Sequence, residues 1–381
     1  MYVLHLLKME NSFIPVNTPL LDGNELEYVS QCIKTGWISS EGPFVVEFEK
    51  KFSHYVEREH GIAVSNGSAA LDIAIRALNI GPGDEVIMPT FTIISPAQSV
   101  VTAGATPVLV DSDPLTWNMD VSQIENKITS KTKAILVVHI YGLPVDMDPV
   151  LDLCKKYKLL LIEDAAEMHG QTYKGRKCGS FGDISTFSFY PNKHITTGEG
   201  GMIVCNDKQI AERCAKLRNL AFEPNGRRFI HFEIGWNYRM TNIQAALGVA
   251  QLEKIEEHLC RKREIGGIYR NGLIGLKGFK QQQFKTEFAE NIYWVFGLVA
   301  DTEELATEMV NNLSEHKIGT RPFFWCIHEQ PIFKKMRIFK NDTYPIAEKL
   351  ARNGFYIPSG LGLSEYYAER VIDIVLKFDN Y

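Results

Sequence analysis

The sequence predicts an α/β fold in which a mostly parallel seven-stranded sheet is flanked by helices and followed by a smaller C-terminal α+β domain. From about residue 60 to about residue 205, short β-rich runs alternate with amphipathic stretches, which is typical of a parallel sheet covered by helices. The chain has 381 residues, more than one hydrophobic core usually supports. These two observations together favour two domains.

The β-rich runs give the expected strands of the sheet. They cover residues 61–65, 85–89, 106–110, 134–139, 159–163, 184–189 and 202–205, with helices expected at 69–78, 121–128 and 149–157. Ligands gather at the carboxyl ends of parallel strands. Asp164, Ser188 and Lys193 each lie at or just after the end of an expected strand, so they can meet at one edge of the sheet although they are far apart in sequence.

The C-terminal part of the chain begins with a long periodic stretch, which predicts a helix over 242–273 that carries the chain into the second domain. Beyond it we expect a strand at 291–299 and helices at 303–316, 344–353 and 366–378. We therefore divide the chain into an N-terminal arm (1–25), a large domain (26–262) and a small C-terminal domain (263–381).

Composition excludes several classes of protein. A net charge of −5, with 45% apolar and 23% charged residues, gives no general attraction to nucleic acid or to anionic membranes. The seven cysteines are scattered without a CxxC pair, which argues against a disulfide framework or a structural metal and fits a reducing cytoplasm. The first seven residues are too short for the apolar core of a signal peptide, and we expect no membrane span.

Lys193 and Asp164 form the most informative pair of residues. Most lysines are solvated surface charges, but Lys193 follows an aromatic strand and precedes the glycine-rich run 196–201. Asp164 ends a hydrophobic strand, where an aspartate can also be a helix N-cap. An amine can hold an aldehyde as a Schiff base, while a carboxylate can keep a pyridine nitrogen protonated. The pair therefore indicates an enzyme that uses pyridoxal phosphate.

A phosphate site is expected where the strand at 61–65 gives way to a helix. Free backbone amides and the helix dipole favour an anion at such a start, which makes Gly67 and Ser68 candidate donors. Ser68 can alternatively be the N-cap of the helix. Ser188 is a further candidate because of its place next to the Lys193 segment.

These segments, together with 36–40, 65–71, 139–142 and 237–242, resemble those of the DegT/DnrJ/EryC1/StrS family of sugar-nucleotide aminotransferases, over nearly the whole chain. The resemblance implies the fold type I of pyridoxal phosphate enzymes, with L-glutamate as amino donor and a nucleotide-linked 4-keto-6-deoxy sugar as acceptor. Within the family, residues 36–42 and 225–228 most resemble the enzymes that convert GDP-4-keto-6-deoxy-D-mannose to GDP-perosamine.

The resemblance also assigns roles to further residues. It implies that Asn237 contacts the cofactor phosphate in the other subunit, and therefore that the protein is a homodimer with shared active sites. Alternatively, Asn237 caps a helix. Glu167 either lies over the cofactor edge or caps a turn. The family's dehydratases carry a histidine in the position that Lys193 holds here, so His194 is a flanking structural residue. Ile93 stands where many relatives place an aromatic residue that stacks on the pyridine ring, so aliphatic packing is expected there.

Substrate contacts rest on the same resemblance. Arginines pair with a diphosphate in a bidentate way, but they can equally be solvated loop charges. His328 lies in a segment similar to one that lines the sugar pocket, or is a packed core residue. The candidates are Trp37, Ser39, Arg227, Arg228, Arg239 and His328. Alternatives for the function are an aminotransferase for a UDP- or dTDP-linked sugar, a dehydratase, or a non-enzymatic sensor of the same fold.

Overall fold

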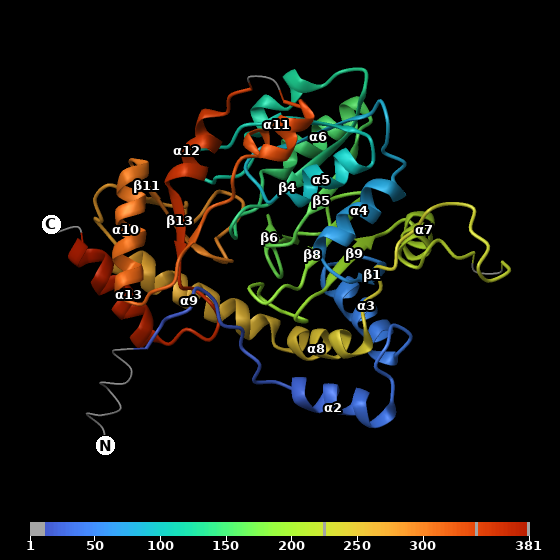
Figure 1. The fold of residues 1–381 in the computed structure, drawn as a ribbon, viewed down its shortest axis with the longest axis horizontal. Helices are drawn as coiled ribbons and strands as arrows, with labels where there is room; N and C mark the ends of the chain where they lie inside the picture. The colour runs from blue at the N-terminus through green and yellow to red at the C-terminus, as the bar shows by residue number, and fades with distance from the viewer. Residues whose placement is uncertain (1–11, 224–225, 340–341, 379–381) are drawn as a thin grey trace.

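The computed structural model describes residues 12–223, 226–339 and 342–378, and its centre is a seven-stranded sheet (Figure 1). The strand order is β1-β9-β8-β5-β4-β2-β3. The pairs from β3 to β8 are parallel, and β9 runs antiparallel to both of its neighbours. The strands are β1 (His60–Val64), β2 (Glu85–Pro89), β3 (Thr106–Val110), β4 (Thr132–Val138), β5 (Leu160–Asp164), β8 (Ile184–Ser188) and β9 (Gly201–Cys205). The predicted α/β architecture is confirmed.

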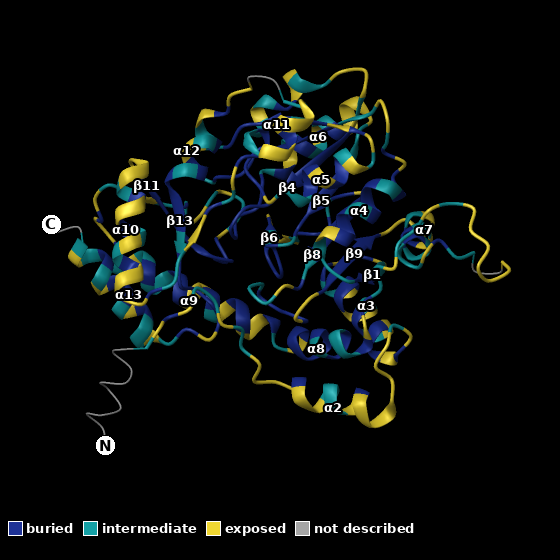
Figure 2. Ribbon diagram, in the orientation of Figure 1, coloured by how far each residue is buried: buried dark blue, intermediate teal, exposed yellow. Residues whose placement is uncertain are grey.

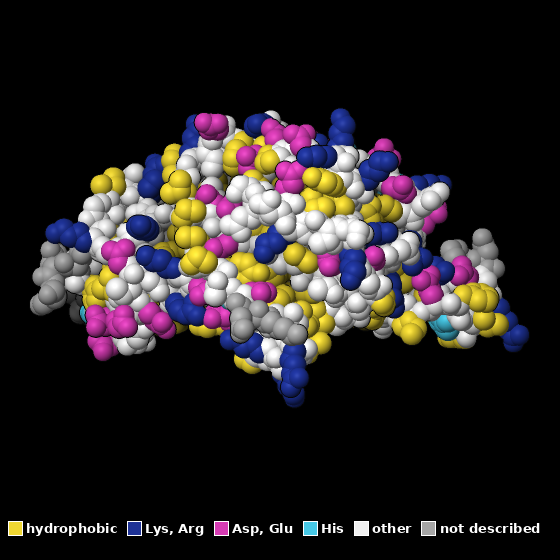
Figure 3. Space-filling view, turned by 90° about the horizontal axis from the view of Figure 1, so that it is seen from above, with side chains coloured by type: hydrophobic (Ala, Val, Ile, Leu, Met, Phe, Trp, Pro, Cys, Tyr) yellow, Lys and Arg dark blue, Asp and Glu magenta, His cyan; other side chains and the backbone are white. Residues whose placement is uncertain are grey.

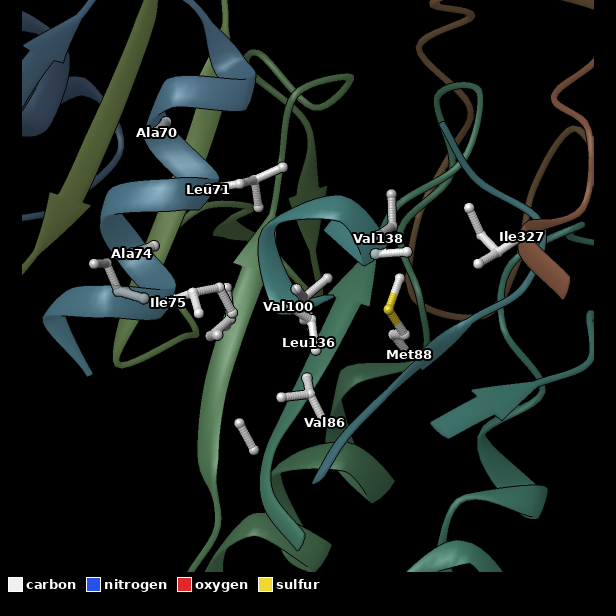
Figure 4. Packing of buried hydrophobic residues seen from close by; sticks show 14 of the residues in the cluster. Ala70, Leu71, Ala74, Ile75, Val86, Met88, Val100, Leu136, Val138 and Ile327 are labelled. Atoms are coloured by element: carbon white, nitrogen blue, oxygen red, sulfur yellow. The ribbon is translucent and has the colours of Figure 1, made fainter. Parts of the chain in front are cut away.

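Helices cover both faces of this sheet, so most side chains of its central strands are buried on both sides. One face carries α4 (Gly67–Ala77), α5 (Ser95–Thr102) and α7 (Lys208–Arg218). The other carries α3 (Pro43–Tyr55), α6 (Met147–Tyr157) and α8 (Asn242–Glu253), with α2 (Glu25–Thr35) packed outside α8. Figure 4 shows the first face, where Leu71 and Ile75 of α4 point towards Leu136 and Val138 of the sheet. Burial is densest in the strands, and the outer helix surfaces are exposed (Figure 2).

A second, four-stranded antiparallel sheet lies beside the first (Figure 1). Its order is β10-β11-β13-β12, from β10 (Phe279–Gln281), β11 (Phe296–Ala300), β13 (Gly354–Ile357) and β12 (Arg321–Pro322). The helices α10 (Glu303–Glu315) and α13 (Glu365–Phe378) form a core with it, and α11 (Pro331–Met336) and α12 (Pro345–Asn353) complete this part. The predicted helices at 303–316, 344–353 and 366–378 are confirmed within one or two residues. The short ribbon of β6 (Thr172–Tyr173) and β7 (Arg176–Lys177) belongs to neither sheet.

Three expectations about the elements are wrong. The predicted helix over 242–273 is two helices, because Lys254, with φ −104° and ψ 4°, interrupts it between α8 and α9 (Ile255–Gly272). The predicted helix over 121–128 is a pair of 3₁₀ turns, η1 (Val121–Gln123) and η2 (Glu125–Lys127). The predicted strand 291–299 begins only at Phe296. The domain boundary near residue 263 falls inside α9 and stays a prediction.

The described part of the N-terminal arm packs across the molecule. Ile14 pairs with Ile318 beside the second sheet, and Asn17 donates a hydrogen bond of 2.9 Å to the Pro191 carbonyl, close to Lys193. The expectation about a signal peptide concerns residues outside the described part. Among the described helices, none combines the length and apolar character that crossing a membrane requires. Acidic and basic side chains are interspersed over the face seen in Figure 3.

Candidate active site

The carboxyl ends of β5 and β8 lie side by side in the sheet. Asp164 is the last residue of β5 and pairs in parallel register with Thr186, so that β8 continues past it to Ser188. The chain then turns, and the backbone N–H of Lys193 donates to the Tyr190 carbonyl at 2.9 Å. Asp164, Ser188 and Lys193 therefore meet at one edge of the sheet, as the order of the strands predicts.

The amine of Lys193 lies between a carboxylate and an aromatic ring. Its side chain is 9% exposed, and its Nζ is 3.8 Å from Oε1 of Glu167 and 3.8 Å from the ring centre of Trp294. Burial lowers the pKa of Lys193, against the opposing effect of the negative charges of Glu167 and Asp164. A lowered pKa increases the fraction of neutral amine, which is the nucleophilic and proton-accepting form.

Both carboxyl groups near this amine are buried, and burial disfavours their charged forms. Burial raises the pKa of Asp164 to about 6, although a hydrogen bond from the Ala166 N–H and the charge of Lys193 act in the opposite direction. Burial likewise raises the pKa of Glu167 to about 8. Glu167 accepts a hydrogen bond of 2.7 Å from the Tyr141 N–H. Its position is therefore fixed beside Lys193, where the sequence left its role open.

The start of α4 approaches the end of β8 closely enough to form a cradle for an anion. A Cβ added at Gly67 would lie 2.9 Å from Cβ of Ser188, so a side chain at this position would collide with the strand end. The N-cap of α4 is Asn66, whose side chain accepts the Ala69 N–H, and the alternative reading of Ser68 as the cap is wrong. The Ser68 hydroxyl instead lies 2.7 Å from the hydroxyl of Ser95. Amides of the first turn and these hydroxyls suit a phosphate.

A buried hydrogen-bond network lies directly beneath Asp164. Both carboxylate oxygens of Glu163 accept backbone N–H groups, from Gly179 at 2.5 Å and from Phe181 at 2.9 Å. His139 Nε2 lies 3.1 Å from Oε1 of Glu163, and Nδ1 of the same ring accepts the Val145 N–H at 3.0 Å. The ring can accept that proton only if its own hydrogen is on Nε2, so His139 donates to Glu163. The network fixes the end of β5 that presents Asp164.

Four of the predicted substrate residues lie together, in a cleft whose lining includes neither Lys193 nor Asp164. They line an open cleft of about 1560 Å³ formed by the loop after α2, by α7 and by the segment after α7. In that cleft Arg239 donates to the side chain of Asn219, and the Arg228 guanidinium lies 5.4 Å from the ring centre of Phe229. Arg227 is exposed nearby. The members of the group are Trp37, Ser39, Arg228 and Arg239.

Asn237 is not the cap of the helix that follows it. Thr241 caps α8, in a capping box with Gln244, and Asn237 instead pairs through its backbone with Asn219 while its side chain is exposed. The alternative reading of Asn237 as a helix cap is therefore wrong. Its predicted contact with the phosphate in another subunit stays a prediction.

The two histidines singled out in the sequence are both buried. His328 has both ring nitrogens in hydrogen-bond distance of partners, with Thr90 Oγ1 at 2.8 Å and Glu348 Oε1 at 3.2 Å. This arrangement supports the core reading, while a sugar contact of His328 remains a prediction. His194 accepts a hydrogen bond of 2.9 Å from His258 through its carbonyl, which agrees with a flanking structural role.

The aromatic residues around Lys193 were missed by the sequence analysis. Trp294 donates from Nε1 to the Asn192 carbonyl at 2.8 Å and lies beside Tyr141, with ring centres 5.6 Å apart. The adjacent aromatic residues Tyr293 and Trp294 could have drawn attention to this segment. Nothing in the sequence, however, indicates that Trp294 contacts the loop at Asn192, 102 residues earlier. Ile93 is 49% exposed in the segment before α5, so its side chain is free to pack on a ligand.

Comparison with known proteins gives a consistent result. A model of the DegT/DnrJ/EryC1/StrS aminotransferase family matches residues 19–376. A GDP-perosamine synthase of Escherichia coli O157:H7 is 45% identical over 96% of this chain and 98% of its own length, and a GDP-perosamine synthase of Caulobacter vibrioides is 46% identical over 94% and 96%. The structure of Streptomyces venezuelae DesV in complex with a ketimine intermediate superposes with a TM-score of 0.87 at 32% identity, covering 94% of this chain and 95% of that one.

Proposed function

The chain belongs to the DegT/DnrJ/EryC1/StrS aminotransferase family, and we propose that it transfers the amino group of L-glutamate to C4 of GDP-4-keto-6-deoxy-D-mannose, which yields GDP-perosamine. It is a sugar-nucleotide aminotransferase that uses pyridoxal phosphate. The observation that carries the proposal is the buried amine of Lys193 beside Glu167 and Asp164, in a chain that is 45% identical over 369 residues to a GDP-perosamine synthase.

The residues of the site fit this cofactor. Asp164 is a buried carboxylate that forms no ion pair within 4 Å in the described part of the chain, so it suits the protonated nitrogen of a pyridine ring. Gly67, Ser68 and Ser188 would hold the phosphate, where the helix start meets the strand end. Lys193 would hold the aldehyde carbon through its amine.

When bound, pyridoxal phosphate supplies an electron sink that stabilises negative charge on the carbon of the amino donor. The chain supplies the proton transfers and the charge that maintains this sink. Nζ of Lys193 takes the proton from the α-carbon of glutamate, and in the second half of the reaction it moves a proton to the sugar carbon. Asp164 keeps the ring nitrogen protonated, and Glu167 is a buried acid 3.8 Å from Nζ that can exchange a proton with it.

The acceptor is proposed to contact the cleft lined by Trp37, Ser39, Arg228 and Arg239, with Arg227 beside it, and His328 is a further candidate for the sugar. Because this cleft is not lined by Lys193 or Asp164 within one chain, the proposal includes a homodimer in which Asn237 reaches the phosphate of the other subunit. The large and small domains, divided near residue 263, and a cytoplasmic location complete the proposal.

A comparison of nucleotides tests the acceptor. Purified protein loaded with pyridoxamine phosphate is mixed with GDP-, UDP- and dTDP-linked 4-keto-6-deoxy sugars, and the loss of the amine form is followed by absorbance. We expect the GDP sugar to react with the highest kcat/KM. Preferred reaction with the UDP or dTDP sugar would support the alternative acceptors, and loss of water from the sugar without amine transfer would support a dehydratase.

A further inference from the structure

Arg321 faces the Lys193 site from the second sheet, and no carboxylate among the described residues pairs with it. It forms no ion pair with any Asp or Glu in the ranges that the structure describes, and its guanidinium donates only to the adjacent Thr320 carbonyl, at 3.2 Å. Arg321 is also exposed. An arginine held in a strand without an anionic partner is free to bind one.

The register of the second sheet determines where this arginine points. Arg321 of β12 lies directly opposite Tyr356 of β13, and opposed residues of an antiparallel pair project from the same face. That face is the one turned towards the large sheet, because the ring of Tyr356 lies 6.4 Å from Trp294 and 6.3 Å from Tyr141. The neighbouring Phe355 projects the other way, into the core with α10 and α13. Figure 1 shows β13 between those helices and the large sheet.

The same face brings Arg321 into the electrostatic environment of the catalytic residues. Burial, together with the charge of Glu167, raises the pKa of Tyr356 to about 12, while the charge of Arg321 acts to lower it. Glu167 lies 3.8 Å from the Lys193 amine. A single tyrosine thus responds both to the carboxylate beside the reacting amine and to the unpaired guanidinium.

From this geometry we propose that Arg321 binds the side-chain carboxylate of the amino donor, and so selects a dicarboxylic amino acid such as L-glutamate. The proposal rests on the proposed function, and it adds the residue that recognises the donor. Arg321 is paired with Tyr356, whose ring lies 6.4 Å from that of Trp294, the ring beside the Lys193 amine. Its place beyond the residues that contact Lys193 suits a carboxylate two methylene groups away from the reacting carbon. The acceptor diphosphate has its own candidate arginines in the separate cleft after α7.

The test compares donors with and without the distal carboxylate. Holoenzyme of the wild type, Arg321→Ala and Arg321→Lys is mixed with L-glutamate or with L-alanine, and the single-turnover absorbance change gives kcat/KM for each donor. Loss of a charge-assisted hydrogen-bonded pair predicts a decrease of about 10- to 100-fold for glutamate in Arg321→Ala. The rate with L-alanine should be unchanged, and Arg321→Lys should lie between the two. Arg263→Ala, which removes an exposed arginine from α9, should match the wild type with both donors.

A binding measurement separates recognition from turnover. Glutarate has both carboxylates but no amine, and its affinity for holoenzyme by calorimetry should fall in Arg321→Ala by a factor similar to that for glutamate. An equal decrease with glutamate and alanine would overturn the proposal, as would unchanged glutarate affinity. An effect confined to the nucleotide sugar would instead place Arg321 in the acceptor site. If the wild type reacts with glutamate but not with the GDP-linked sugar, the proposed acceptor is wrong, while the proposal for Arg321 is unaffected.

Discussion

The substitution Glu163→Gln tests whether the network beneath Asp164 holds the active site in place. In the wild type the carboxylate accepts hydrogen bonds from His139 at 3.1 Å, from the Gly179 and Phe181 N–H groups at 2.5 and 2.9 Å, and from the Ser185 hydroxyl at 3.0 Å. Glutamine keeps the shape but offers only one oxygen. Its NH₂ group would face donors, which leaves backbone N–H groups without an acceptor in a site that is fully buried.

Leaving a buried donor without its charged acceptor typically costs about 1–3 kcal/mol or more per group, and because more than one donor is affected we expect a loss of about 3–5 kcal/mol in the free energy of unfolding. Although burial acts to raise it, the pKa of Glu163 is lowered overall by the hydrogen bond from His139 and by those from the N–H groups of Gly179 and Phe181. A lowered carboxyl pKa adds stability above the unfolded value of about 4.3, and this stability is lost as the pH falls through the folded pKa. Wild type and variant should therefore converge in stability at acid pH.

Urea unfolding of both proteins at neutral pH and at decreasing pH measures this difference. Glu308→Gln is the matched control, because Glu308 is exposed on α10 and its loss should change stability by less than about 0.5 kcal/mol. A destabilisation by Glu163→Gln of less than about 1 kcal/mol, or a difference that does not depend on pH, would refute the reasoning.

Three other outcomes are expected. Lys193→Ala should bind pyridoxal phosphate without a covalent bond that borohydride can reduce, and turnover should fall by at least about 10²- to 10⁴-fold; a reduced cofactor found by mass spectrometry on another lysine would refute the assignment. Asp164→Asn should lose most of the rate of α-proton removal in stopped flow. In the cofactor-free wild type, the raised Asp164 pKa of about 6 predicts that the free energy of unfolding decreases by roughly 3 kcal/mol as the pH rises from about 4. Cofactor-free Asp164→Asn should not show this decrease. Mixed subunits of Lys193→Ala and Asn237→Ala should recover about half of the wild-type activity per heterodimer, because one of two sites is whole; heterodimers without activity would place Asn237 in its own chain's site or outside any site.

The large sheet and the position of the site could be predicted because they depend on local patterns. Short apolar runs bounded by turns specify buried strands, and the ends of two such strands present Asp164 and Ser188. The break at Lys254 could not be predicted, since the apolar spacing continues across it and only the backbone turn at that residue separates α8 from α9. The 3₁₀ turns after Asp120 were missed for a similar reason, because its side chain accepts the Ser122 N–H and competes with a regular helix.

Contacts between segments that are far apart in the chain could not be predicted from the sequence. Trp294 is a hundred residues from the loop it touches, and no periodicity relates the two. The same limit applies to Arg321, whose significance appears only in its register with Tyr356. Local signals were also misread, because the N-caps of α4 and α8 are Asn66 and Thr241, and not the alternatives Ser68 and Asn237.

The charges of the site explain why this fold needs its cofactor. In the chain alone, burial raises the pKa of Asp164 and Glu167 and lowers that of Lys193, so each group is pushed towards its neutral form. A cationic ring nitrogen beside Asp164 and an anion at the start of α4 would favour the charged carboxylate and satisfy the free amides. The same burial that disfavours the charged forms of these groups without a ligand also excludes water. It keeps more of Lys193 in the neutral form, which can accept a proton. Cofactor binding and the stability of the large sheet are therefore coupled, because a ligand that binds only the folded chain stabilises it.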